Sequence, residues 1–286
     1  MSGRPRPLRL GTRASPLALV QAGLVAAAIG HDVELVQLTT SGDSGGGEDK
    51  RRWVDRIEDA LSAGTVDLAV HSAKDLPGEL ADGLEIAGAP VRADPRDALC
   101  GAKSLAALAP GARVGTSSLR RAAQLRALRD DLEIVAIAGN VDTRLARIGE
   151  LDAVVLAQAG LDRLGRGGAA VLDELVPAVG QGVLAIEARK GDARVGEAIA
   201  GLRDGATERA LSAERALARA LEADCHTPIG AHAAVLADGL LELRAFVGRA
   251  DGSSWLRDAL SGNDPVALGE ALAERLRCVG AEEILA

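Results

Sequence analysis

The sequence is poor in aromatic residues and has no long apolar run. Its 286 residues include one Phe, two Trp and no Tyr, so the side chains on which single-stranded nucleic acids stack are nearly absent. The net charge of −8 also argues against generic nucleic-acid binding. No apolar stretch approaches the roughly 20 residues of a membrane-spanning helix. We therefore expect neither a nucleic-acid partner nor a membrane span.

Cysteine is also scarce. The three cysteines are Cys100, Cys225 and Cys278, and none belongs to a CxxC pair. This excludes a disulfide framework and fits a reducing compartment. Met1–Leu10 is rich in Arg and Pro and lacks the apolar segment of a secretory signal. We expect a cytoplasmic protein.

Cys225 lies between polar neighbours in a loop, so it is a better candidate for covalent chemistry than the other two thiols. Residue chemistry alone would still favour an unreactive loop cysteine. The spacing of Cys225, His226 and His232 matches no strong metal-site pattern, so we expect no metal.

The sequence does contain a regular alternation of strand and helix patterns. Strands are expected at 8–10, 33–38, 66–70, 113–114, 132–137 and 153–156, and helices at 16–29, 53–63, 119–128 and 141–148. This alternation predicts two α/β units with mainly parallel sheets. The C-terminal part differs, with helices at 207–221 and 265–279 and two strands within 233–247. It predicts a smaller α+β domain.

The two α/β units look related to each other. In both Leu10–Ser15 and Val114–Ser118 a strand ends in Gly-Thr and a helix starts near a capping Ser. Aligning Val66–Val70 with Leu151–Val155 places Asp75 opposite Gly160. Chance similarity between short units is the alternative. If the repeat holds, both halves share a scaffold, only the first carries the acid, and a ligand is expected in the cleft between them.

Polar side chains follow the apolar run that begins at Val66. The run ends in His71, Ser72, Lys74 and Asp75, where a buried strand emerges from the core. Ligands bind at such strand ends in open α/β sheets. An acid held there can be aimed and partly desolvated. His71 is expected to be a hydrogen-bonded core residue rather than a base.

Arginines recur near the expected strand ends although the chain is acidic. Arginine suits bidentate recognition of carboxylates, and helix N-termini favour anions. For any single arginine a solvated helix position is a competing interpretation. As a group they predict a polyanionic ligand; they are Arg13, Arg120, Arg121, Arg144, Arg147 and Arg163.

The chain resembles the porphobilinogen deaminase family, also called the hydroxymethylbilane synthases. Similar stretches run nearly end to end: Gly11–Ala18, Val70–Pro77, Asp94–Ala98, Val114–Arg121, Gly139–Val141, Thr143–Leu145, Ala157–Gly165, Pro177–Gly182, and Cys225 with Pro228–Gly230. The resemblance implies two α/β domains similar to type II periplasmic binding proteins and a smaller C-terminal α+β domain. The expected boundaries are 1–91 with 185–205, then 92–184, then 206–286.

The resemblance also implies an activity. Four porphobilinogen units would be condensed stepwise to hydroxymethylbilane with loss of ammonia, by a monomer primed with a dipyrromethane cofactor on Cys225. Asp75 and Lys74 are the implied catalytic residues. The implied cofactor contacts are Cys225, Arg13, Ser15, Lys74, Asp75, Thr116, Ser117, Ser118, Arg120, Arg121, Arg144 and Gln181. The implied contacts to substrate carboxylates are Arg13, Arg144, Arg147 and Arg163.

Several positions depart from the family pattern and bear on catalytic efficiency: Arg51, Arg52, Trp53, Ala138, Asp142 and Asp224. Trp53 stands where an aromatic lid residue is usual, and Asp142 brings a negative charge near Arg144. Two other functions compete with the transferase. One is a non-catalytic polycarboxylate-binding protein of the same cleft fold, and the other is a phosphate-binding transferase, which no nucleotide-binding motif supports.

Overall fold

The computed structural model describes residues 6–30, 32–42, 50–223 and 227–285. The chain forms two compact units, Met1–Arg92 with Val183–Glu208, and Ala93–Gly182 with Arg209–Ala286. No helix in the part of the chain that the structure describes is long and apolar enough to cross a membrane.

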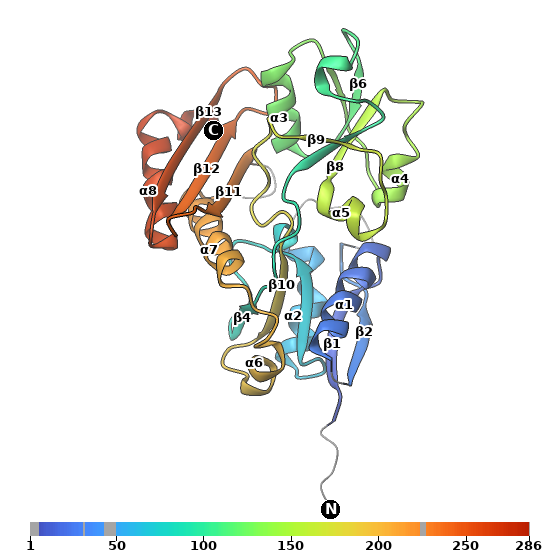
Figure 1. The fold of residues 1–286 in the computed structure, drawn as a ribbon, viewed down its shortest axis with the longest axis vertical. Helices are drawn as coiled ribbons and strands as arrows, with labels where there is room; N and C mark the ends of the chain where they lie inside the picture. Colours follow the sequence, from blue (N-terminus) through green and yellow to red (C-terminus); the bar gives the residue numbers. More distant parts are fainter. Residues whose placement is uncertain (1–5, 31, 43–49, 224–226, 286) are drawn as a thin grey trace, which may run out of the picture. The chain divides into compact units, whose positions relative to one another are not determined.

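The first unit is built on a five-stranded sheet in the order β2-β1-β3-β10-β4 (Figure 1). The strands are β1 (Leu8–Arg13), β2 (Val33–Leu38), β3 (Leu68–Ser72), β4 (Leu84–Gly88) and β10 (Leu184–Arg189). β1 pairs in parallel with β2 and β3, whereas β10 runs antiparallel to β3 and β4. β10, which lies between β3 and β4 inside the sheet, therefore comes from a late part of the chain.

Helices cover both faces of this sheet. Apolar residues of α1 (Pro16–Ile29) and α6 (Ala193–Ile199) pack on one face, against Leu68, Val70 and Ile186. α2 (Asp55–Ser62) packs on the other face against Ala69. Successive residues of β3 thus alternate between two cores, as the pleat requires.

The second unit contains a five-stranded sheet in the order β7-β6-β8-β5-β9. Its strands are β5 (Asp97–Cys100), β6 (Arg113–Gly115), β7 (Glu133–Val135), β8 (Ala153–Ala157) and β9 (Ala170–Leu172). β6 pairs in parallel with β7 and β8, and β5 is antiparallel to β8 and β9. Its connected helices are α3 (Leu119–Leu128), α4 (Val141–Leu145) and α5 (Gln158–Arg163).

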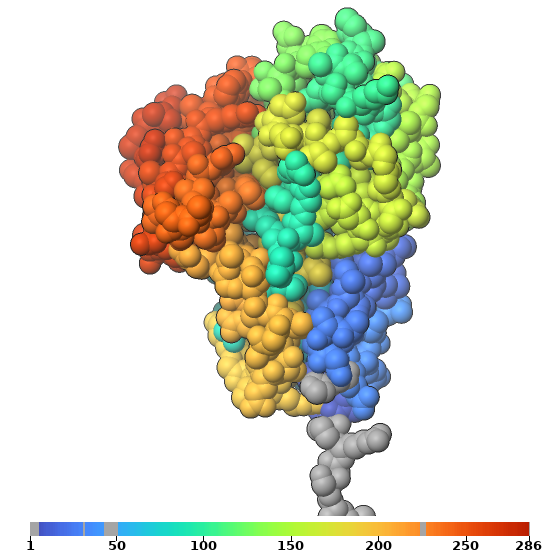
Figure 2. Space-filling view, viewed as in Figure 1, coloured from blue at the N-terminus to red at the C-terminus, as the bar shows by residue number. Residues whose placement is uncertain are grey.

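The same unit holds a three-stranded antiparallel sheet in the order β11-β12-β13. The strands are β11 (Ile229–Val235), β12 (Leu241–Gly248) and β13 (Trp255–Gly262), and the helices are α7 (Gly205–Ala220), α8 (Pro265–Cys278) and α9 (Ala281–Leu285). Residues of α7 and α8 share one apolar core with this sheet. The space-filling view shows this part, orange to red, against the green segment that includes α3 (Figure 2), and α3 contacts β12.

The predicted fold class is confirmed, because two α/β sheets of matching strand order accompany a smaller antiparallel sheet. Helices α1 and α3 begin and end at the predicted residues. The expectation of mainly parallel sheets did not include the antiparallel pairing of β10 and β5, and the strands β10 and β13 were not predicted. The three-domain boundaries stay a prediction.

Candidate active site

A pocket opens in the first unit where β1 and β3 end. It holds about 430 Å³ of empty space, part of it continuous with open solvent. Its wall includes Arg13 and Ser15 from the β1–α1 turn, Ser72 and Asp75 after β3, and Trp53. The structure thus has a pocket at the strand ends where the sequence predicted a ligand site.

Asp75 ends a short 3₁₀ turn, η2 (Ala73–Asp75), that continues directly from β3. Two contacts hold the start of this turn. The Ala73 amide donates to the Val183 carbonyl at 3.0 Å, and Gln21 Nε2 donates to Ser72 Oγ at 2.9 Å. Lys74 lies in the same turn. The side chain of Asp75 is half-buried, so its carboxylate can meet a ligand from a fixed backbone.

Arg13 and Ser15 reach the same pocket from the start of α1. Ser15 caps the helix, since its hydroxyl accepts from the Ala18 amide at 3.3 Å. The Arg13 guanidinium lies over the indole of Trp53, 4.3 Å from the ring centroid. Trp53 closes the 3₁₀ turn η1 (Lys50–Trp53), and a Cβ at Gly42 would come within 2.5 Å of its ring. Trp53, which stands at the usual position of an aromatic lid residue, thus packs on Arg13, a residue predicted to bind carboxylates.

In the second unit the corresponding turn carries Thr116, Ser117 and Ser118. The Ser118 hydroxyl caps α3 by accepting from the Arg121 amide, and the Ser118 amide donates to Thr116 Oγ1 at 3.2 Å. Ser117 Oγ donates to the Ile137 carbonyl at 2.6 Å and accepts from the Ile137 amide at 2.9 Å. These hydroxyls build the turn, and their predicted contacts to a cofactor stay a prediction.

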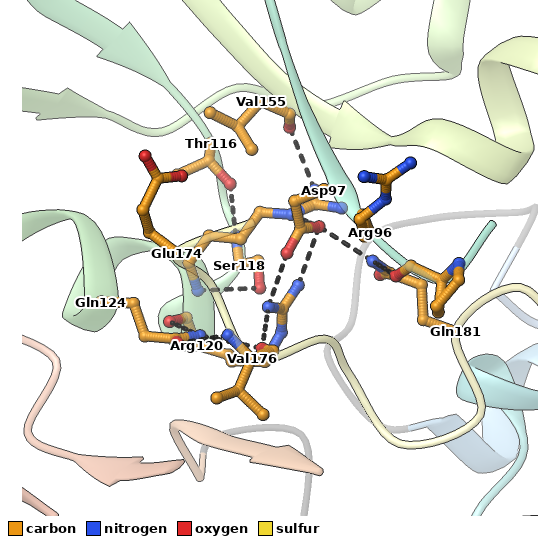
Figure 3. A network of polar contacts seen from close by, with 12 residues as sticks. Arg96, Asp97, Thr116, Ser118, Arg120, Gln124, Val155, Glu174, Val176 and Gln181 are labelled. Carbon is orange, nitrogen blue, oxygen red and sulfur yellow. Dashed lines mark hydrogen bonds and ion pairs between the residues drawn. The ribbon is translucent and has the colours of Figure 1, made fainter. Parts of the chain in front are cut away.

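Arg120 and Arg121 bind a buried carboxylate, Asp97, that the sequence analysis did not single out. Arg120 Nη1 lies 2.7 Å from Asp97 Oδ2, and Arg121 Nε lies 2.8 Å from Oδ1 (Figure 3). Gln181 Nε2 donates to Asp97 Oδ1 at 3.0 Å. Burial disfavours the charged carboxylate, but the charges of Arg120 and Arg121 outweigh it and hold the pKa of Asp97 far below its ordinary value. In the structure both arginines bind the carboxylate of Asp97. Their predicted contact with the cofactor stays a prediction.

The other predicted arginines have diverse surroundings. Arg144 Nε donates to the Gly139 carbonyl at 2.8 Å, and the guanidinium of Arg147 binds Glu150 at 2.6 and 2.8 Å. Arg163 is largely buried, which lowers its pKa, and it donates to the Gly182 carbonyl at 2.8 Å. Asp142 pairs with Arg166 at 2.7 Å. The negative charge of Asp142 is therefore compensated by Arg166, which is not among the arginines predicted to bind the ligand.

Cys225, with its neighbours Asp224 and His226, lies outside the residues that the structure describes. The flanking elements are described: α7 ends at Ala220 and β11 begins at Ile229. Glu222 has a positive φ of 51°, a conformation uncommon for residues other than glycine. The chain therefore turns sharply just before the predicted cofactor attachment point.

Two family models match most of the chain. Residues 8–197 match the family model "Porphobilinogen deaminase, dipyromethane cofactor binding domain", and residues 209–277 match "Porphobilinogen deaminase, C-terminal domain". Among solved structures, a periplasmic substrate-binding protein of an ABC transporter from Coxiella burnetii aligns with a TM-score of 0.43 at 17% identity, over 70% of this chain and 94% of that one.

Full-length relatives are more informative. The porphobilinogen deaminase of Roseiflexus sp. strain RS-1 is 48% identical over 300 residues, covering 98% of each chain. That of Rubrobacter xylanophilus is 48% identical over 301 residues, covering 100% of this chain and 97% of the relative. The strand-end acid, the arginine-rich turns and these matches lead to one conclusion: the chain belongs to the porphobilinogen deaminase family.

Proposed function

We propose that the protein condenses four porphobilinogen units stepwise to hydroxymethylbilane, releasing ammonia at each step, with a dipyrromethane cofactor bound covalently to Cys225. The observation that carries the proposal is the pocket wall that holds Asp75 together with Arg13. Family membership supplies the substrate and the cofactor.

The residues of the second unit fit an anionic cofactor. Arg120 and Arg121 both bind Asp97, so two guanidinium charges face one carboxylate. Arg120 Nε is buried and has no hydrogen-bond partner among the described residues. A buried cationic excess favours binding of a further carboxylate. We propose that Arg120, Arg121, Arg144 and Gln181, with the turn Thr116–Ser118, hold the acidic side chains of the dipyrromethane.

In the first unit Asp75 would do the chemistry. When porphobilinogen loses ammonia, positive charge develops on the carbon that carried the amine and spreads into the pyrrole ring. A fixed carboxylate stabilises that charge and accepts a hydrogen bond from the pyrrole N–H. It can also take the proton that the attacked pyrrole carbon loses. When bound, the dipyrromethane supplies the pyrrole carbon to which the first substrate unit is added.

Cationic side chains orient the substrate in this scheme. Each porphobilinogen carries an acetate and a propionate, so the growing chain is strongly anionic. We propose that Arg13, Lys74, Arg144, Arg147 and Arg163 bind these carboxylates, and that Ser15 lies beside Arg13 as a further contact to the cofactor. Trp53 holds the Arg13 guanidinium by stacking at 4.3 Å, which limits the orientations available to that group. We also propose a monomeric, cytoplasmic enzyme that binds no nucleic acid.

Intact-mass spectrometry with a turnover assay tests the proposal. The protein, purified from a host that makes porphobilinogen, should carry the added mass of one dipyrromethane, mapping to Cys225, and should release ammonia from porphobilinogen. Cys225→Ser should lack both the added mass and the turnover, whereas Cys278→Ser, an exposed thiol on α8, should keep both. Unmodified and inactive wild-type protein would favour the non-catalytic binding alternative.

A further inference from the structure

Three ionisable side chains are buried together beside the pocket. They are Glu58 on α2, His71 on β3 and Glu187 on β10, with exposed fractions of 7%, 6% and 0%. His71 Nε2 lies 2.8 Å from Glu187 Oε2. Within residues 6–30, 32–42, 50–223 and 227–285, no group of His, Cys, Asp and Glu is arranged to hold a metal ion. The cluster therefore needs another explanation.

The sheet register brings these groups to one face. Glu187 pairs directly with Ala69 across the β3–β10 ladder, and Ala69 shares its face of β3 with His71, two residues on. Because Ala69 has only a methyl side chain, it leaves room beside it for the glutamate carboxylate. α2 covers this face, which brings Glu58 toward the pair. His71 is thus a buried core residue, as predicted, and its partner is a carboxylate.

The charges in this cluster are poorly compensated by hydrogen bonds. Neither oxygen of Glu187 accepts a hydrogen bond from any described residue, although His71 Nε2 lies 2.8 Å from Oε2. A buried carboxylate without hydrogen bonds depends on the nearest polar group for compensation, and here that group is the His71 imidazole.

Glu58 differs from Glu187 in its surroundings. Burial raises its pKa and the charge of Glu187 adds to this, against the Ala81 amide, His71 and Arg51. Packing an apolar residue in the same volume is often at least as stabilising as a buried ion pair. The pair is therefore better explained by what it holds in place than by stability alone.

The elements joined by this cluster carry two sides of the pocket. His71 itself lines the pocket and precedes Asp75 by four residues on the same strand and turn. Trp53 and Val54, which line another part of the wall, lead directly into α2. A shift of β3 relative to β10 or α2 would therefore move Asp75 relative to Trp53 and Arg13.

We propose that Glu187 is a positioning residue that holds His71, and through it the end of β3, so that Asp75 keeps its place in the pocket. This role rests on the proposed function. It gives Glu187 an effect on turnover without contact to substrate, since the residue is fully buried. It distinguishes Glu187, which contacts His71, from Glu58, whose Oε1 accepts a hydrogen bond from the Ala81 amide.

The test compares Glu187→Gln with Glu58→Gln in the cofactor-loaded protein. Both changes remove a carboxylate from the same cluster with little change of shape. Glu187→Gln should lower kcat at least tenfold while KM stays within about threefold, because substrate contacts remain. Glu58→Gln should leave both constants within about twofold. A wild-type kcat in Glu187→Gln, beside an active wild type, would overturn this role alone.

A double variant separates positioning from folding stability. The double variant His71→Gln with Glu187→Gln replaces the buried pair by two amides. The decrease in thermal midpoint that Glu187→Gln causes should therefore be largely reversed. We expect kcat to stay at least tenfold low. Return of kcat together with the thermal midpoint would show a merely structural pair and overturn the role. If Glu187→Gln alone does not fold, the kcat of the double variant is compared with that of the wild type instead. Inactive wild-type protein would reject the proposed function and this role with it.

Discussion

The two α/β sheets share strand order and register but differ in the charges that they carry. Gly11 pairs with Ala69 in the first sheet, and Gly115 pairs with Val154 in the second. Counting on from these pairs places Asp75 opposite Gly160, as the sequence repeat predicted. Gly160 is buried within α5 and offers no carboxylate. The duplicated scaffold therefore presents one acid, in the first half.

The antiparallel strand of each sheet sharpens the comparison. By the same register Glu187 of β10 occupies the position of Cys100 in β5, and Asp97 of β5 occupies the position of Leu184 in β10. The cluster beside the pocket thus buries two acidic side chains with one imidazole, and the second sheet buries two guanidinium groups with one carboxylate. Acidic side chains thus predominate in the first set and arginines in the second.

The largest effect is expected from Asp75→Asn, which removes the acid that only the first half has. Turnover should fall about 100- to 1000-fold, the range for removing a group that stabilises transition-state charge. The thermal midpoint should hardly change, because the Asp75 side chain is only half-buried and the substitution keeps its size. Steady-state kinetics and thermal unfolding on one preparation check both points. Near-normal turnover would remove Asp75 from its proposed role.

Asp97→Asn should affect stability most. It leaves Arg120 and Arg121 buried without their counter-charge, which costs about 3–5 kcal/mol of unfolding free energy. Asp94→Asn is the matched control, since Asp94 is less buried and its pair with Arg96 should contribute about 1 kcal/mol or less. Urea unfolding at pH 7 compares the two. Equal losses would contradict the charge arrangement inferred for the second half.

The Asp97 contribution also has a defined pH dependence. Its pKa is depressed in the folded state, so its stabilisation is present above the unfolded value of about 3.9 and is lost as pH falls through the folded value. The difference between wild type and Asp97→Asn should therefore persist at pH 5 and shrink in stronger acid. A difference that disappears between pH 7 and pH 5 would contradict this.

A smaller effect is expected at the aromatic residue of the pocket. Trp53→Phe should weaken the stacking on Arg13 by about 0.5–1 kcal/mol and raise KM a few-fold. Trp255→Phe is the control, because Trp255 lies on β13 and is 46% exposed. Its KM should match wild type. Porphobilinogen should change the tryptophan fluorescence of Trp255→Phe, which keeps Trp53, and not that of Trp53→Phe.

The smallest effect should come from Glu58→Gln, and only at higher pH. The pKa of Glu58 is raised in the folded state, chiefly by burial. Its stabilising contribution is therefore complete below the unfolded value of about 4.3 and is lost as pH rises through the folded value. The variant should match wild type near pH 4.5 and gain relative stability toward pH 8 in urea unfolding. Glu270→Gln, an exposed change on α8, should show no such trend.

The features that depend on local structure, such as helix starts and strand ends, were predicted from local patterns in the sequence. Ser15 and Ser118 mark the starts of α1 and α3, and both helices begin where a serine cap predicts. The strand that ends before Asp75 was found because an apolar run meets polar residues. β10 was not predicted, because its place between β3 and β4 depends on pairing with strands that are distant in the sequence. β13 was missed because every residue of it is at least partly exposed.

The site shows the same division. Arg13 and Asp75 were predicted from strand-end positions and line one pocket. Arg120 and Arg121 were correctly placed at the start of a helix, but the partner of a buried arginine depends on which strand lies beside it, here β5 with Asp97. Glu187 was missed for the same reason. Its contact with His71 joins residues 116 positions apart.

The place of β10 in the first sheet has a consequence for synthesis on the ribosome. β3 pairs with β1 on one side and with β10 on the other, and β10 separates β3 from β4. Until residues 184–189 leave the exit tunnel, the strand that leads to Asp75 has an open edge and β4 has no neighbour in the sheet. The nascent N-terminal half therefore lacks one strand of its sheet until a segment made after the whole second α/β sheet is available, and its exposed strand edge is open to pairing with other chains.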